Sequence, residues 1–262
     1  MSEDTKRSGI DRRHFFSIGA AAGAGALVTA GLADPAFAAP ADGPAKGSTP
    51  LTIMAKPLPE KVFTTEAAGI SRKTHTAHYT LYQGYVRKVN EIRLALSNLA
   101  VPDAAKANAT FSDLRELKVE YSFALGGVKN HELYFNHIGG KGGEPTGPIG
   151  DAIKSAFGSF DNWKADLKAT GIAARGWVWL AHDHTDGSLF NYIGDAQNSY
   201  PVWNATPLLG LDVYEHAYFV DFGPRRAEYI EARRLLPRRV VHGCRSARPG
   251  FADRERRATA DK

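Results

Sequence analysis

A glycine- and proline-rich run between two differently patterned halves most constrains the fold of this chain. The ten residues 139–148 include five Gly and two Pro. Such a run does not form a regular helix or strand, because glycine leaves the backbone unrestrained and proline lacks an amide hydrogen. It therefore predicts a boundary between two parts of the chain.

The segment before this boundary has the pattern of two helices. Helical patterning begins near Glu66 and ends at Val101-Pro102-Asp103, and a second helix is expected from Ser112 to His137. We therefore predict a helical hairpin domain over residues 61–140. The apolar residues that recur at near-helical spacing in the first helix are Tyr82, Tyr85, Val86, Val89, Ile92, Leu94 and Leu96.

The segment after the boundary mixes both kinds of element. Helices are expected over 150–157 and 160–170, and strands over 176–181 and 188–193, joined by a turn at Asp186-Gly187. Residues 208–213 form a third apolar strand, and helix returns from Tyr218. We therefore predict an α/β domain over 148–232, which makes the whole an α+β fold.

The N-terminus has the pattern of an export signal. Arg12-Arg13 precedes a run rich in Ala and Gly, which ends before the small-x-small site Ala36-Phe37-Ala38. This order is typical of a twin-arginine (Tat) signal peptide over residues 1–38, and a membrane anchor fits less well because the run is short and weakly apolar. We therefore expect a periplasmic or extracellular protein without a membrane anchor in its mature form, and a linker over residues 39–60.

The charge of the chain is concentrated at its C-terminus. The net charge is +5, but residues 233–262 hold nine Arg and one Lys against three acidic residues, so they carry +7 and the remainder −2. The folded part is therefore not expected to bind nucleic acid. Residues 233–262 read as a basic, disordered tail, since Pro237 interrupts any helix and the charge density is high. The single cysteine, Cys244, excludes an intrachain disulfide.

The segment 212–218 has the pattern of a metal site. It places Asp212 and His216 four residues apart among aromatic residues. An anionic oxygen and a neutral imidazole make half of a first-row transition-metal site, and His78 and His131 are candidates for the other half. Three His and one Asp suit iron or manganese, and the absence of thiolates argues against a structural zinc site.

Several motifs follow one another in order within residues 74–232. They are Asn130-His131, Gly142–Gly147, Phe157–Phe160, Gly176–Leu180, Ala205–Leu209, Asp212–Tyr218, Arg225-Arg226 and Tyr229-Ile230. In this order they resemble the iron/manganese superoxide dismutases. The family fold is a helical hairpin domain followed by an α/β domain with a three-stranded antiparallel sheet, with the metal between the two.

The resemblance implies that His78, His131, Asp212 and His216 bind the metal. His78 lies seven residues before Tyr85, whereas the family usually has eight residues between the matching positions, so His75 remains a second candidate. Three further histidines, His137, His182 and His184, match no ligand motif and are expected at the surface or in loops.

The resemblance also bears on the choice of metal. Manganese-type members carry Gly four residues before the second His ligand and supply a glutamine fifteen residues before the Asp ligand. Gly127 and Gln197 occupy these positions here. The residues around bound solvent tune the reduction potential of the metal, so we predict manganese, with iron as the alternative. Gln197 could instead be a plain turn residue.

The implied activity is the conversion of two superoxide anions into O₂ and H₂O₂ by a metal that alternates between two oxidation states. Tyr85 matches the residue that relays protons and filters anions. Phe135, Trp177 and Trp179 match the aromatic wall of the site, although such aromatics also serve as ordinary core.

The sequence departs from the family at three places. Leu81 and Phe219 stand where most members have a His–Tyr pair at the dimer interface, but Glu215, which pairs with a ligand His across that interface, is kept; a homodimer or homotetramer is expected. Tyr214 replaces a Trp. Beyond Ala232 the usual aromatic-rich helix is absent, so the tail is either newly acquired or the product of a shifted reading frame. These departures leave a second hypothesis, an exported metal-binding protein with little or no dismutase activity.

Overall fold

The computed structural model describes residues 50–99, 104–140 and 142–232. The predicted signal peptide, most of the predicted linker and the predicted basic tail lie outside these residues. All of the described residues belong to one compact unit.

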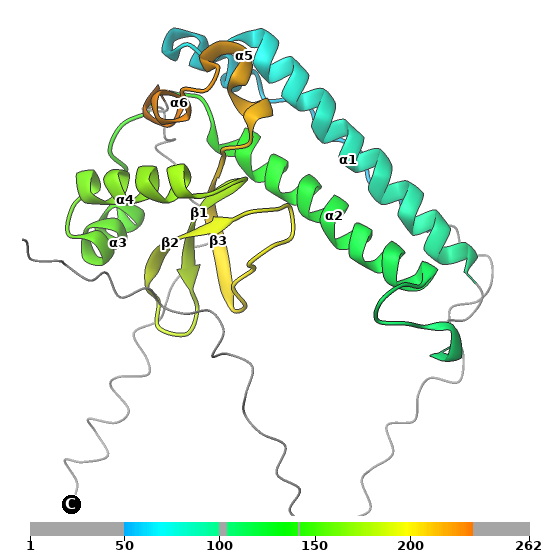
Figure 1. Ribbon diagram of the computed structural model, residues 1–262. Coiled ribbons are helices and arrows are strands. Elements are labelled where there is room, and N and C mark those ends of the chain that lie inside the picture. The colour runs from blue at the N-terminus through cyan, green and yellow to red at the C-terminus, as the bar shows by residue number, and fades with distance from the viewer. Residues whose placement is uncertain (1–49, 100–103, 141, 233–262) are drawn as a thin grey trace, which may run out of the picture. The chain divides into compact units, whose positions relative to one another are not determined.

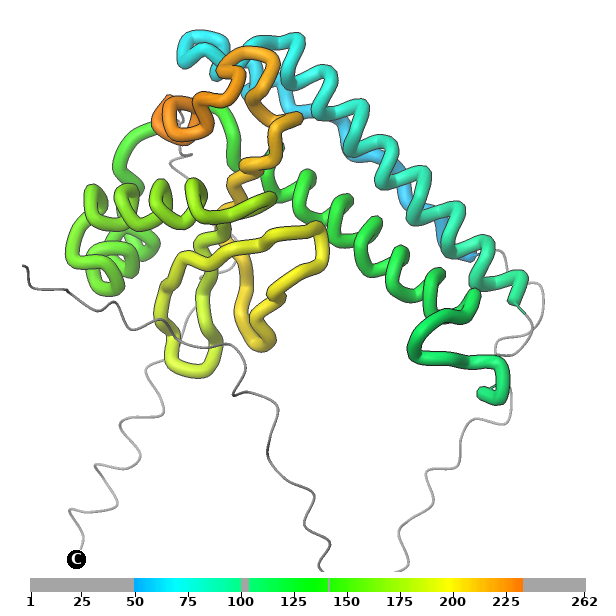
Figure 2. Tube along the Cα trace, in the orientation of Figure 1, coloured from blue at the N-terminus to red at the C-terminus, as the bar shows by residue number. Residues whose placement is uncertain are grey.

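The N-terminal part of the described chain consists mainly of two long helices, as the sequence predicts. Helix α1 covers Arg72–Asn98 and helix α2 covers Asp113–His137, and the two lie side by side (Figures 1 and 2). Each begins after a serine whose hydroxyl accepts a hydrogen bond from a backbone amide of the first turn, Ser71 from Thr74 N and Ser112 from Arg115 N. The 3-10 helix η2 (Glu60–Ala68) precedes α1, so the helical pattern that starts near Glu66 belongs to two elements; the short η3 (Ala104–Lys106) lies between α1 and α2.

A stretch of extended chain runs along α1 before η2. The Asn90 side chain accepts a hydrogen bond from Ile53 N and donates one to Ile53 O, both at 2.9 Å. Farther along, Lys56 N donates to the Tyr82 hydroxyl, and the Tyr79 hydroxyl donates to Lys56 O. These bonds satisfy backbone groups that no strand or helix would satisfy.

The C-terminal domain consists of helices and a three-stranded antiparallel sheet in the order β2-β1-β3. This confirms the predicted α+β fold class, with its helical hairpin and its sheet. Helical structure after the sheet is divided into three short pieces, because the chain must turn sharply around Asp212 and again at Gly223. The elements are α3 (Pro148–Phe157), α4 (Phe160–Ala173), β1 (Trp177–Asp183), β2 (Leu189–Gly194), β3 (Ala205–Asp212), η4 (Glu215–Ala217), α5 (Phe219–Phe222) and α6 (Arg226–Ala232).

The central strand β1 carries much of the core. Six of its seven residues are buried. Trp179 lies directly opposite Gly210 of β3, and a side chain at that glycine would approach the indole to 2.4 Å. Only glycine therefore fits beside this tryptophan. Pro207 lies in the edge strand β3 next to a register shift, where a missing amide hydrogen is tolerated.

One expectation about this domain is wrong. His182, expected at the surface or in a loop, is buried in β1 and only 9% exposed. Histidine is more often found at the surface, but this one lies in the central strand, where it pairs with Leu189 of β2 on one side and Thr206 of β3 on the other. His184 is exposed beyond the strand end, as expected, and His137 is half-buried at the end of α2.

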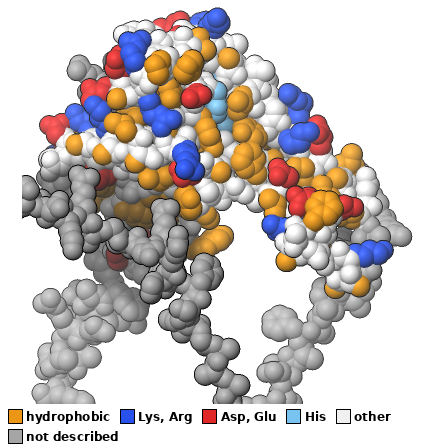
Figure 3. Space-filling model, viewed as in Figure 1, with side chains coloured by type: hydrophobic (Ala, Val, Ile, Leu, Met, Phe, Trp, Pro, Cys, Tyr) orange, Lys and Arg blue, Asp and Glu red, His pale blue; other side chains and the backbone are white. Residues whose placement is uncertain are grey.

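The surface of the described part mixes residue types. Figure 3 shows Lys and Arg interspersed with Asp and Glu, and hydrophobic side chains between them, on the face it presents. Within the described residues, no helix is both long and apolar enough to span a bilayer.

Candidate metal centre

Four elements bring the predicted ligands together. His78 comes from α1, His131 from α2, Asp212 from the end of β3 and His216 from η4. One donor atom from each lies within 4.8 Å of the others. His78 and Asp212, which are 134 positions apart in the chain, thus meet in one cluster. We call the four residues together the metal centre.

The Asp212 carboxylate is the middle of this cluster. Its Oδ2 lies 3.1 Å from His78 Nε2, 3.0 Å from His216 Nε2 and 3.6 Å from His131 Nε2. Three of the four side chains are fully buried, whereas that of His216 is 26% exposed. The centre is therefore enclosed on most sides and is nearest to solvent at His216.

Several backbone contacts fix the position of Asp212. Its Oδ1 accepts a hydrogen bond from Tyr214 N at 2.9 Å, and its carbonyl oxygen accepts one from the Tyr229 hydroxyl at 2.8 Å. The next amide, Val213 N, donates to Gly176 O at 2.8 Å. The backbone around Asp212 is thus held by α6 and by the residue before β1, and its carboxylate by the amide of Tyr214.

The charges of the cluster are set by burial and by the carboxylate. Burial opposes ionisation of Asp212, but the neighbouring His216 and His78 outweigh it and hold the pKa of this carboxyl below its usual range. Burial lowers the pKa of His78, and it lowers that of His131, together with the His78 charge, to about 3. At neutral pH the centre therefore offers one carboxylate and at least two neutral imidazoles.

The donor atoms fit a transition metal. His131 Nδ1 lies 2.6 Å from Gly127 O, and because a carbonyl only accepts, Nδ1 carries the proton and Nε2 has a free lone pair. His131 Nε2 is buried and has no hydrogen-bond partner among the described residues. A buried lone pair aimed at a carboxylate and two more imidazoles is the environment in which iron or manganese is held.

The structure separates His78 from its rival His75. Helix α1 is a continuous α-helix, and His78 points into the metal centre. His75 is also buried, but its Nε2 lies 2.6 Å from the Thr65 hydroxyl and it is outside the cluster. The shorter spacing to Tyr85 therefore does not prevent His78 from reaching the other ligands.

Gln197 lies next to the centre and is only 5% exposed. Its Oε1 accepts hydrogen bonds from Trp177 Nε1 at 3.2 Å and from Asn130 Nδ2 at 3.3 Å, which directs its amide group toward the Tyr85 hydroxyl. Burial and the Asp212 charge raise the pKa of Tyr85, and the contact with Gln197 lowers it less. Tyr85 is therefore protonated at neutral pH and able to donate a proton.

Gly127 leaves room for this arrangement. A Cβ at this position would lie 2.6 Å from the Tyr85 ring. Gly127 O also fixes the tautomer of His131. One residue of α2 therefore sets the tautomer of a predicted ligand and the position of the predicted proton donor.

The predicted aromatic wall is present, but its members lie at different distances from the ligands. Trp177 packs edge-on against His131, with ring centroids 5.2 Å apart, and Phe135 packs against His78 at 5.1 Å. Trp179 stacks on Trp177 instead, at 5.0 Å. Trp179 is thus one layer farther out than the sequence implied.

Two of the residues expected at a dimer interface, Glu215 and Phe219, are close in sequence to His216, the ligand nearest to solvent. Glu215 is exposed, and its side chain forms no hydrogen bond or ion pair within the described part of the chain. Phe219 and Val220 are 51% and 55% exposed, and Leu81 is half-buried.

Sequence reasoning missed residues that support the centre. Asn130 donates to both the backbone and the side-chain oxygen of Gln197. Tyr214 stacks on His216 with centroids 5.4 Å apart and donates to Asp195 O at 3.1 Å. The available signal was that Asn130 is next to His131 and that Tyr214 lies between Asp212 and His216, but their hydrogen-bond partners, Gln197 and Asp195, are not close in sequence.

Several known proteins are similar to this chain in sequence. Residues 145–234 match the family described as "Iron/manganese superoxide dismutases, C-terminal domain". The chain is 42% identical over 167 residues to "Superoxide dismutase [Fe]" of Aquifex aeolicus, which covers 63% of this chain and 78% of the relative. It is 35% identical over 168 residues to "Superoxide dismutase [Fe]" of Cupriavidus metallidurans (63% and 82%) and 33% identical over 166 residues to "Superoxide dismutase [Mn] 1" of Halobacterium salinarum (62% and 80%). With these relatives matched over more than two thirds of their length, the chain belongs to the iron/manganese superoxide dismutase family.

Proposed function

We propose that this protein is a superoxide dismutase that acts at a single manganese ion bound by His78, His131, Asp212 and His216. The observation that carries the proposal is the buried cluster of three imidazoles around the Asp212 carboxylate. The metal, when bound, supplies the one-electron oxidation and reduction of superoxide.

The protein residues around it supply position and protons. Asp212 and the histidines bind the ion, and the tight fit of Tyr85 against Gly127 places a phenol beside the centre. Tyr85 holds the proton that the peroxide product requires, and the Gln197 amide orients it. The aromatic rings of Trp177 and Phe135 exclude water from two sides of the ligands.

Gly127 and Gln197 support manganese over iron. The names of the relatives include both metals, so they do not decide between them. Gln197 comes from the C-terminal domain, where its Oε1 accepts a hydrogen bond from Trp177 Nε1, and Gly127 stands four residues before His131. This is the combination that the manganese-type sequence pattern implies.

The first experiment is to purify the mature chain, beginning at Ala39, and to measure its metal content and dismutase activity per bound metal. We expect about one manganese per chain, the stoichiometry of a single four-ligand centre. Gln197→Ala should change the manganese-to-iron ratio and lower activity per metal. Gln83→Ala, the other glutamine of the chain, is the control. Unchanged metal choice and activity in Gln197→Ala would refute the role of Gln197.

The second candidate function is metal binding without dismutation. The replacement of the usual His–Tyr pair by Leu81 and Phe219 supports it, because the two apolar residues provide no proton path. Stoichiometric metal with no activity above that of the free ion would favour this reading.

We infer that the protein forms a homodimer or homotetramer. The exposed carboxylate of Glu215, which forms no ion pair within the described residues, and the exposed Phe219 and Val220 support this. Sedimentation should show an assembly that Glu215→Ala weakens, whereas Glu120→Ala, an exposed site on α2, should not weaken it.

We also propose export by the Tat system and residence in the periplasm or outside the cell. Arg12-Arg13 and the site at Ala36–Ala38 support this proposal. Changing both arginines to lysine should leave the chain in the cytoplasm with its first 38 residues attached. A processed, exported chain from that variant would refute the Tat route.

A further inference from the structure

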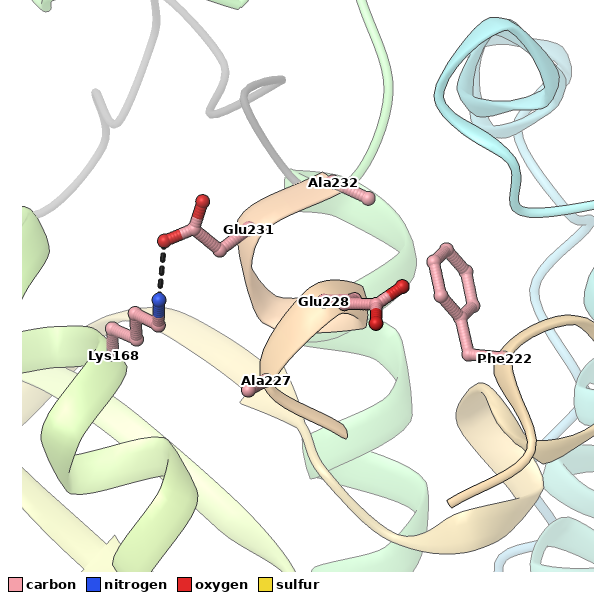
Figure 4. Close-up of a pocket in the computed structure, with 6 residues that line it drawn as sticks. All are labelled: Lys168, Phe222, Ala227, Glu228, Glu231 and Ala232. Atoms are coloured by element: carbon pink, nitrogen blue, oxygen red, sulfur yellow. Dashed lines mark hydrogen bonds and ion pairs between the residues drawn. The ribbon is translucent and has the colours of Figure 1, made fainter. Parts of the chain in front are cut away.

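Two neighbouring hollows lie between α4 and α6. The larger has a volume of about 640 Å³, and the smaller about 480 Å³. Lys168 and Glu231 line both, and they form an ion pair that joins the two helices (Figure 4). We call the two hollows together the α4–α6 groove; each is as large as a typical ligand cleft, roughly 300–1,000 Å³.

The larger hollow has an apolar floor. Leu167, Leu211 and Ile230 line it, and they are 5%, 2% and 8% exposed. Its rim carries Asp161 and Lys164, which pair at 2.7 Å. A floor of this kind favours aliphatic side chains, and a rim with carboxylates favours cations at its edge.

The described chain ends at this groove. Ala232, the last described residue, lines the smaller hollow, and Figure 4 shows it at the end of α6 above Glu228 and Phe222. Thirty residues follow it. A segment of nine residues can span at most about 30 Å from that point, which exceeds the length of α4, about 21 Å for its 14 residues.

The sequence that follows suits the groove. Leu235-Leu236 and Val240-Val241 are apolar pairs, separated by Pro237. Four arginines flank them at positions 233, 234, 238 and 239. Three carboxylates line the two hollows, and each pairs with a cation: Asp161 with Lys164, Glu228 with Arg225 and Glu231 with Lys168.

We propose that residues 233–241 of the same chain dock in the α4–α6 groove, with Leu235 and Leu236 on its apolar floor. Docking covers the outer side of α6, which has only seven residues and needs tertiary contacts to be stable. Because the Tyr229 hydroxyl of α6 holds the carbonyl oxygen of Asp212, this segment stabilises the loop that carries two of the metal ligands. The predicted disordered tail then begins beyond residue 241.

A disulfide trap tests the position directly. In the full chain with Cys244→Ser, we combine Leu236→Cys with Ala165→Cys, a residue that lines the larger hollow. Mild oxidation should give an intramolecular disulfide, detected as a monomer that has lost two hydrogen atoms in mass and both free thiols. Leu236→Cys with Thr185→Cys, in the exposed turn between β1 and β2, is the control and should keep its thiols.

A stability measurement complements the trap. Leu235→Asp with Leu236→Asp should lower the Tm by about 5–10 °C, since two buried leucines are exposed. Ala258→Asp with Ala260→Asp adds the same charge far along the tail and should leave the Tm unchanged. Intermolecular disulfides would assign the groove to a second copy of the chain, and either that result or the absence of both effects would overturn the proposal.

Discussion

The space left by Gly127 decides where Tyr85 lies. A methyl group at this position would meet the Tyr85 ring at 2.6 Å, well inside van der Waals contact. The ring must therefore move if any side chain is added, and its hydroxyl leaves its place beside Gln197. This is a property of one backbone position rather than of the helix as a whole.

Gly127→Ala should lower kcat by about tenfold to a hundredfold, because the proton donor is displaced. Gly84→Ala in α1 is the matched control, since a Cβ there would meet only the end of Arg87 at 3.7 Å. The control should keep its activity and gain about 0.5–1 kcal/mol in free energy of unfolding from the better helix former. Steady-state kinetics and thermal unfolding of both variants test this; equal kcat would refute it.

The two buried histidines of α1 differ in their partners. His78 faces Asp212, whereas His75 pairs with Thr65. His78→Ala should therefore lose bound metal. His75→Ala should retain it at full stoichiometry but with a free energy of unfolding lower by about 1–3 kcal/mol, because the buried Thr65 hydroxyl loses one of its hydrogen-bond partners. Metal analysis after dialysis distinguishes them, and metal loss in His75→Ala alone would make His75 the ligand.

At the scale of elements, a distant carboxylate caps the start of α1. Asp221 Oδ2 accepts hydrogen bonds from Ser71 N at 2.8 Å and from the Thr74 hydroxyl at 2.7 Å. Partial burial opposes ionisation, but these hydrogen bonds outweigh it and lower the pKa of Asp221. The helix that carries His78 is thus anchored to α5, 150 residues later in the chain.

This cap predicts a pH dependence. A carboxyl whose pKa is lower in the folded state stabilises the protein above its unfolded pKa of about 3.9, and loses that contribution as pH falls through the folded value. Asp221→Asn should therefore be less stable than the parent at neutral pH, and the difference should shrink below about pH 4.

Chemical unfolding of the metal-free chains across this pH range measures the difference. Glu120→Gln is the control, since Glu120 is exposed on α2 and forms no hydrogen bond or ion pair within the described residues. A difference that stays constant with pH would show that the Asp221 charge is not what stabilises the cap.

At the scale of the whole molecule, the metal centre joins the helical hairpin to the α/β domain. Two ligands come from the hairpin and two from the segment 212–216. Without the ion, the Asp212 charge is balanced only by imidazoles whose protonation burial opposes. Metal binding and the packing of the two domains are therefore expected to be coupled.

Removal of the metal by chelation should lower the Tm by about 8–16 °C, if the free ion is present at a thousand times its dissociation constant. Readdition of manganese should restore the Tm, whereas magnesium, which prefers oxygen ligands, should not. Calorimetry with circular dichroism measures both effects. An unchanged Tm would mean that the four residues are a structural cluster rather than a metal site.

Much of the fold followed from local pattern. The ends of α2 and α4, the turn at Gly187 and the three strands agree with the predictions within a few residues, because helix caps, glycine turns and apolar runs act over short distances. The helix expected from Tyr218 is divided instead, since the chain must bend to place His216 beside Asp212 and Tyr229 behind it.

The sequence by itself determined the element types, the family resemblance and the four candidate ligands, because these are properties of residue type and order. Tertiary structure alone decided that His78 rather than His75 joins the cluster, that His182 is buried, that Trp179 stands behind Trp177, and that Asn130 orients Gln197. His78 meets Asp212 across 134 residues and Asn130 meets Gln197 across 67, so only the packing of the helices against the sheet brings these side chains within reach.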